Sequence, residues 1–162
     1  MKIEKILKTM EYGKAPESQK LAQAWIEKNK SKFGLFIDGK FQFSKGRDFF
    51  ETRNPASGEL LAFICQANQQ DVDQAMHAAR TAQNKWEKIG GADRAKYIYA
   101  LARLIQKHAR LFSVLETLDN GKPIRESRDI DIPLVARHFY FHAGAAQLME
   151  KEMVDQKAHG VV

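Results

Sequence analysis

The chain has 162 residues, a formal net charge of +6 at pH 7 and a single cysteine. Hydrophobic residues make up 44% of the sequence and charged residues 28%, which is close to a globular domain and excludes a disordered tail. No apolar run approaches the eighteen residues of a membrane-spanning helix, and one cysteine cannot form an internal disulfide, so a cytoplasmic protein without a membrane partner is expected.

The positive charge is concentrated in the leading segment. Residues 1–32 contain eight lysines and four glutamates, which supply four of the six net positive charges. These lysines alternate with acidic residues, and neither an aromatic-rich strand motif nor a metal-finger spacing accompanies them. A nucleic-acid partner is therefore not expected, and a basic nucleic-acid binder stands only as a third functional alternative.

The first half of the chain reads as a helix followed by strands. Residues 16–29 have an apolar stripe and predict a short helix with Pro16 in its first turn. Residues 35–66 predict a small antiparallel meander, with a hairpin at Asp38-Gly39, a turn over 54–59 and a last strand over 60–67. We expect residues 1–32 to form a helical leader.

The second half of the chain changes to helical periodicity. Asn68 is a suitable N-cap, Asp71 stands three residues later, and Gly90-Gly91 is expected to end this helix. Apolar residues from 97 to 118 then form one stripe, which predicts a single amphipathic helix about seven turns long. A turn over 119–123 precedes a short helix and a last helix that ends near residue 149.

The residues that could carry chemistry have plain structural explanations. Cys65 lies inside a predicted strand, where a buried structural thiol fits better than a nucleophile. His138 and His142 are four residues apart, but the neighbouring glutamate of a zinc-protease helix is missing, so they are interpreted as packing residues. Asp129 and Asp131 are interpreted as helix caps. The glycines form no dinucleotide or phosphate fingerprint, so we expect no catalytic or cofactor-binding residue in the chain.

Several ordered motifs resemble the aldehyde dehydrogenases. The helical stretch 66–88 is similar to the first helix of the family, and RNPASGE (53–59) is similar to the turn before that helix. The stretch 94–127 resembles its second helix with the following turn, and 131–148 resembles the aromatic helix that comes next. The resemblance extends from about residue 33 to residue 162, and the leader over 11–27 is most similar to family 16 of this superfamily.

The resemblance implies an α/β fold, of which this chain would be the N-terminal part, truncated before the main parallel sheet. Residues 33–162 would form an incomplete N-terminal portion of the cofactor-binding domain. The complete enzyme would use NAD or NADP to oxidise an aldehyde through a cysteine thiolate and would form homo-oligomers. None of its catalytic motifs is present here, so the chain alone is expected to be inactive. The alternative is a non-catalytic, dehydrogenase-like interaction module.

One functional site is carried over from the family. Some members hold a monovalent cation with the threonine before the Asn-Pro turn and the aspartate of the LDNGKP turn. These positions are Thr52 and Asp119 in this sequence. Hydroxyl and carboxylate oxygens suit a hard cation, although an aspartate in a turn also commonly bonds its own backbone.

Overall fold

The computed structural model describes residues 18–43 and 46–152. Its helices are α2 (Lys20–Lys28), α3 (Gln69–Lys88), α4 (Gly91–Lys107), α5 (Ala109–Asn120), α6 (Ile124–Glu126) and α7 (Ile132–Glu152), with a π-helical segment, η1 (Ser127–Asp131), before α7. Its strands are β1 (Lys32–Phe33), β2 (Leu35–Ile37), β3 (Lys40–Gln42), β4 (Phe49–Arg53) and β5 (Leu60–Cys65). The expected helix over 16–29 is present as α2, whereas Pro16 lies outside the described residues.

The strands form two sheets, so the prediction of one antiparallel meander is wrong in its topology. Strands β2 and β3 make the expected hairpin, with positive φ at both Asp38 and Gly39. Strand β5 pairs antiparallel with β4 but parallel with β1. Between β1 and β2 a Cβ atom on Gly34 would lie 2.4 Å from the carbonyl oxygen of Gln42. The missing side chain at Gly34 therefore allows the hairpin to fold back closely as it leaves the three-stranded sheet.

Helix α3 begins as the sequence predicts. Asn68 and Asp71 form a capping box, in which each side chain accepts a hydrogen bond from the other residue's backbone N–H. The helix ends at Lys88, just before Gly90, and the Arg94 guanidinium donates a 2.8 Å hydrogen bond to the Ile89 carbonyl. Arg94 therefore satisfies a carbonyl group just beyond the helix end, where intrahelical partners are missing.

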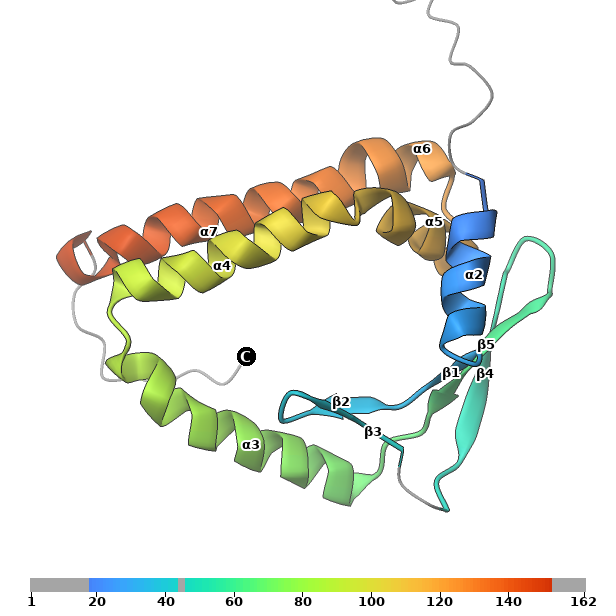
Figure 1. The fold of residues 1–162 in the computed structure, drawn as a ribbon, viewed down its shortest axis with the longest axis horizontal. Helices are drawn as coiled ribbons and strands as arrows, with labels where there is room; N and C mark the ends of the chain where they lie inside the picture. Colours follow the sequence, from blue (N-terminus) through green and yellow to red (C-terminus); the bar gives the residue numbers. More distant parts are fainter. Residues whose placement is uncertain (1–17, 44–45, 153–162) are drawn as a thin grey trace, which may run out of the picture.

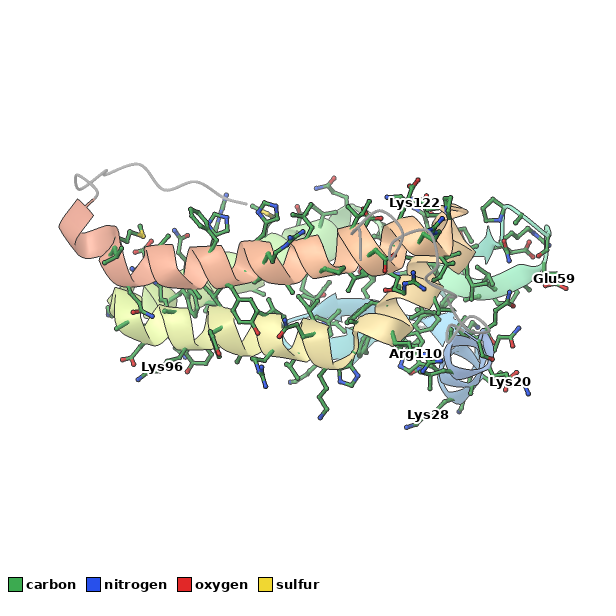
Figure 2. The ribbon with its side chains drawn as sticks, turned by 90° about the horizontal axis from the view of Figure 1, so that it is seen from above. Lys20, Lys28, Glu59, Lys96, Arg110 and Lys122 are labelled. Carbon is green, nitrogen blue, oxygen red and sulfur yellow. The ribbon has the colours of Figure 1, made fainter. Side chains whose placement is uncertain are left out.

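Helices α4 and α7 lie side by side along most of their length, with α3 on the opposite side of the molecule (Figure 1). Figure 2 shows the same pair from above, with Lys96 toward one end and Lys122 near the other. Small side chains fill their contact, where the buried apolar residues are alanines: Ala95, Ala102, Ala136, Ala143 and Ala146. Such small residues allow two helix backbones to approach closely.

The long helix predicted over 97–118 is interrupted at His108. Helix α4 ends at Lys107 and α5 begins at Ala109, with His108 at φ −108° and ψ 14° between them. Helix α4 packs mainly against α7, whereas α5 packs mainly against η1 and contacts α2 and α7 less extensively. The α4 part of the predicted apolar stripe is exposed at Tyr97, Leu101 and Leu104, and the buried apolar residues of α4 are Ala95 and Ala102 instead.

A small core forms where α2 meets α5. Ala22 of α2 packs with Val114 and Leu118 of α5, and all three are at least 95% buried. The partly buried side chains around them come from β5, α5 and α6: Leu61, Leu111, Leu115 and Ile124. Strand β1 meanwhile extends from Lys32 to Phe33 and pairs with β5. Helix α2 and β1 thus hold part of the leader against the rest of the chain, while its division from 33–162 stays a prediction.

The interpretation of Asp129 and Asp131 as helix caps is wrong. Both lie within η1, which continues into α7 without an intervening turn. The Asp131 carboxylate instead accepts a hydrogen bond from Lys122, and Asp129 pairs with Arg128 at 2.6 Å. The two carboxylates therefore form ion pairs, Asp131 with Lys122 in the turn after α5 and Asp129 with its neighbour Arg128, and neither caps a helix.

Candidate functional site

A cavity lies between α2, the three-stranded sheet and α5. It has a volume of about 340 Å³ and is lined mostly by apolar side chains. The lining residues are Trp25, Ile26, Phe33, Thr52, Leu61, Ala62, Ile64, Phe112, Leu115, Glu116, Leu118, Asp119 and Ile132. The cavity is large enough for a small ligand, at the lower end of the usual range.

Thr52 and Asp119 meet in this cavity, although 67 residues separate them in the sequence. The Thr52 hydroxyl donates a hydrogen bond to Oδ1 of Asp119. Thr52 is held in β4 by its pairing with Ala62 of β5, and Asp119 belongs to the last turn of α5. Gly121 ends that helix in the left-handed conformation, at φ +81°. The structure therefore brings together the two residues that the family resemblance selects.

A second carboxylate, Glu116, lies in the same cavity one turn before Asp119. It is partly buried, and it has no hydrogen bond or salt bridge within the described part of the chain. No lysine, arginine or histidine of residues 18–43 and 46–152 lines the cavity. The site is thus negatively charged, a property that the sequence motifs alone did not reveal.

Cys65 is buried in β5, at 4% exposure, as expected for a structural thiol. Its sulfur lies 3.9 Å from the Gln66 carbonyl oxygen. It is not among the residues that line the cavity. The structure gives Cys65 no contact that would activate it as a nucleophile within the described chain.

The interpretation of His138 and His142 as packing residues is wrong, because both side chains are exposed on α7. The His142 ring contacts Phe141 edge-on at a centroid distance of 5.3 Å. The described residues contain no group of three or more potential metal ligands of the His, Cys, Asp or Glu type. None of their helices is long and apolar enough to cross a membrane.

Two ion pairs between segments were not predicted from the sequence. Arg47 and Asp71 pair at 2.9 Å, and the side chains are 20% and 6% exposed. Lys122 donates to Asp131, and this hydrogen bond raises the pKa of the Lys122 ammonium above its ordinary value. Both pairs connect residues whose proximity depends on the folded chain, so no local motif could have identified them.

A family comparison decides the classification. The model of the aldehyde dehydrogenase family matches residues 41–162, which is most of the chain. The chain belongs to the aldehyde dehydrogenase family. Its relatives include the DhaS protein of Bacillus subtilis (strain 168), which is named as an aldehyde dehydrogenase and is 46% identical over 112 residues. This alignment covers 68% of the present chain but 23% of DhaS.

Solved structures of aldehyde dehydrogenases share the fold. The NAD+ complex of the enzyme from Bacillus cereus is 37% identical, with a TM-score of 0.70 over 77% of this chain and 25% of that one. HpcC from Thermus thermophilus is 29% identical, with a TM-score of 0.72 over 78% of this chain and 25% of that one. The chain thus has the N-terminal part of the aldehyde dehydrogenase fold and spans about a quarter of the length of these relatives.

Proposed function

We propose that this chain serves as the N-terminal part of an enzyme that oxidises an aldehyde to a carboxylic acid with NAD or NADP. The observation that carries the proposal is the family match over residues 41–162. Solved relatives in complex with NAD+ favour NAD over NADP. The relatives named above are dehydrogenases, so the alternative of a non-catalytic interaction module is not favoured.

Within this enzyme the described residues would act as scaffold. The cavity carries two carboxylates and no basic side chain from the described chain, so it does not suit the negatively charged pyrophosphate of a dinucleotide. Cys65 is buried and makes no activating contact. We therefore propose no cofactor site and no nucleophile among residues 18–43 and 46–152 and assign them no chemical step.

Activity measurements separate the scaffold role from catalysis. The purified 162-residue chain is mixed with NAD and a panel of aldehydes, and absorbance of the reduced cofactor is followed. We expect no turnover by the chain alone and turnover by a longer product of the same gene that carries the catalytic motifs of the family. Turnover by the pure 162-residue chain would contradict the scaffold role, and an inactive longer product would contradict the proposed dehydrogenase activity.

We further propose that the complete enzyme is a cytoplasmic homo-oligomer. The single cysteine fits a reducing compartment. Phe141 and Leu148 of α7 are 70% and 54% exposed, and Tyr97 of α4 is 62% exposed. Exposed apolar side chains of this size commonly mark surfaces that other polypeptide covers. Sedimentation of the complete enzyme as a monomer over a wide concentration range would contradict the oligomer.

A monovalent cation at Thr52 and Asp119 is proposed as a second function of the chain. The contact between the two side chains in the cavity supports it, because both supply oxygen atoms of the type that hard cations accept. We expect sodium or potassium to raise the melting temperature of the full chain more than an equal concentration of a quaternary ammonium ion, which has no N–H group to bind the carboxylates. Asp119→Asn should abolish this difference. Equal effects of all cations on the unsubstituted chain would refute the site.

A further inference from the structure

We propose that the cavity between α2, the three-stranded sheet and α5 binds a small organic ammonium ion: a protonated primary amine that carries an apolar body. This proposal goes beyond the proposed dehydrogenase function and does not depend on it. It differs from the inorganic cation site in using Glu116 and the aromatic lining in addition to Asp119. Three features of the cavity lead to it: its charge, its position at a helix terminus and its aromatic side chains.

The charge of the cavity selects a cation. Glu116 and Asp119 are three residues apart on α5, so they lie on the same side of the helix. Both line the cavity, whereas no basic side chain of the described residues does. Two basic groups donate hydrogen bonds to other carboxylates, Lys122 to Asp131 and Arg53 to Glu51, although Lys122 also interacts electrostatically with Glu116. An ammonium ion would compensate two carboxylates that accept no hydrogen bond from a basic side chain of the described residues.

The C-terminal end of α5 adds to the negative electrostatic potential of the cavity. Both carboxylates lie in the last five residues of a 12-residue helix, where the helix dipole places partial negative charge. The last turn of α5 contains no basic residue that would offset it. An ammonium group at this position would therefore interact with both side chains and with the helix terminus. Its N–H groups would form charge-assisted hydrogen bonds, which are stronger than neutral ones.

Aromatic side chains favour an organic ion over a metal ion. Trp25 and Phe33 stack at a centroid distance of 5.3 Å with an interplanar angle of 18°, and both line the cavity. Phe112 of α5 lines it as well and is 43% exposed. Such faces attract cations and also gain from covering an apolar body. An amine with a ring-sized substituent satisfies both parts of the site.

Fluorescence of Trp25 provides a direct test in the full chain. The chain has two tryptophans, so a Trp86→Phe background leaves Trp25 as the only reporter. The probe is benzylammonium at neutral pH, and benzyl alcohol serves as a neutral analogue of similar shape. We expect saturable quenching by benzylammonium, with an affinity at least about tenfold higher than that of benzyl alcohol, because charged hydrogen bonds contribute on this scale.

Substitutions then assign the binding to the cavity. Glu116→Gln keeps the size of the side chain and removes its charge, and it should weaken benzylammonium binding about tenfold without changing benzyl alcohol binding. Glu59→Gln is the matched control, because Glu59 is exposed in the turn before β5 and does not line the cavity (Figure 2). We expect the control to bind like the Trp86→Phe background. Circular dichroism of each variant verifies the fold.

Three results would overturn the proposal. Absence of quenching by benzylammonium would show that the cavity does not take an amine. Equal affinities for benzylammonium and benzyl alcohol would reduce the site to apolar contact. Loss of binding in Asp119→Asn but not in Glu116→Gln would assign the signal to a cation at the Thr52–Asp119 contact alone. Weakening in both folded variants is the result that supports the ammonium site.

Discussion

Asp71 is the residue whose replacement tests the structure most severely. Its Oδ2 atom accepts a 2.9 Å hydrogen bond from the Asn68 backbone N–H and thereby completes the capping box of α3. Its Oδ1 atom accepts a 2.9 Å hydrogen bond from the Arg47 guanidinium. The carboxylate is 6% exposed, so one side chain both begins a 20-residue helix and fixes the segment before β4. Asp71→Ala removes both interactions at once.

The size of the effect follows from these two interactions. Loss of a helix-capping interaction costs about 1 kcal/mol. Loss of a hydrogen bond to a charged group costs about 1.5–3 kcal/mol, and it leaves the Arg47 guanidinium, whose side chain is 20% exposed, without this partner. We therefore expect Asp71→Ala to lower the free energy of unfolding by about 3 kcal/mol. For a chain of this size the melting temperature should fall by about 6–12 °C.

Urea unfolding followed by circular dichroism measures this difference directly. Asp73→Ala is the matched control, because Asp73 is exposed on the same helix and accepts a hydrogen bond only from the Gln69 side chain. The control should change the free energy of unfolding by less than about 0.5 kcal/mol. An Arg47→Met, Asp71→Ala double-mutant cycle should give a coupling energy above about 1 kcal/mol. Equal destabilisation by the two alanine variants would refute the reasoning.

Two further predictions concern the turn after α5. Gly121→Ala should lower the free energy of unfolding by at least about 2 kcal/mol, because the residue has φ +81° and a Cβ atom would lie 2.7 Å from Cγ of Pro55. Gly39→Ala is the control, because Gly39 has φ +71° but a Cβ atom there would meet open space. This control should lower the free energy of unfolding by about 1 kcal/mol in the same urea assay. The hydrogen bond to Asp131 raises the pKa of Lys122 above 10.5, so its stabilisation is complete below pH 10.5 and is lost as pH rises through the higher folded value. Lys122→Met should therefore lower the melting temperature at pH 9. It should also make the fall of the melting temperature between pH 10 and 12 smaller than in the unsubstituted chain. An equally large fall in both proteins would contradict the predicted role of Lys122.

Local signals predicted the structure well where the determining atoms lie within a few residues of each other. The Asp38-Gly39 hairpin depends on two consecutive positive φ angles, which these residue types tolerate. The start of α3 depends on two side chains three residues apart, Asn68 and Asp71. Both predictions are confirmed because the sequence alone contains all the groups that form the interaction.

Partners from distant parts of the chain explain what the sequence could not show. The stripe from 97 to 118 continues without a glycine or proline, so its periodicity gives no sign of the interruption at His108. At the interruption the main partner changes, because α4 packs mainly against α7 and α5 mainly against η1. Likewise, β1 pairs with a strand about 30 residues later in the sequence, and turn chemistry does not encode such a parallel pairing.

The candidate site combines both kinds of information. The pair Thr52 and Asp119 was found only through the family resemblance, and its cation stays a prediction even though the structure places the two residues in contact. The sequence does not single out Glu116, because a carboxylate near the end of an amphipathic helix resembles any solvated surface residue. Only the fold shows that Glu116 lines the same cavity as the aromatic side chains of α2 and β1.

The alanines between α4 and α7 explain why so many large apolar side chains remain exposed. Ala95 and Ala102 are seven residues apart, as are Ala136 and Ala143, so each pair lies on one face of its helix. With small residues inside, the large apolar side chains of the two helices face outward and are 40–70% exposed: Tyr97, Leu101, Leu104, Leu134, Val135, Phe141 and Leu148. Burying one such side chain contributes about 1.5–3 kcal/mol, so the pair leaves much of its available stabilisation unrealised within the described residues. The chain spans about a quarter of the length of its relatives. Outward apolar faces of this kind fit the proposal above that the chain is the N-terminal part of a longer dehydrogenase, in which further polypeptide would pack on them.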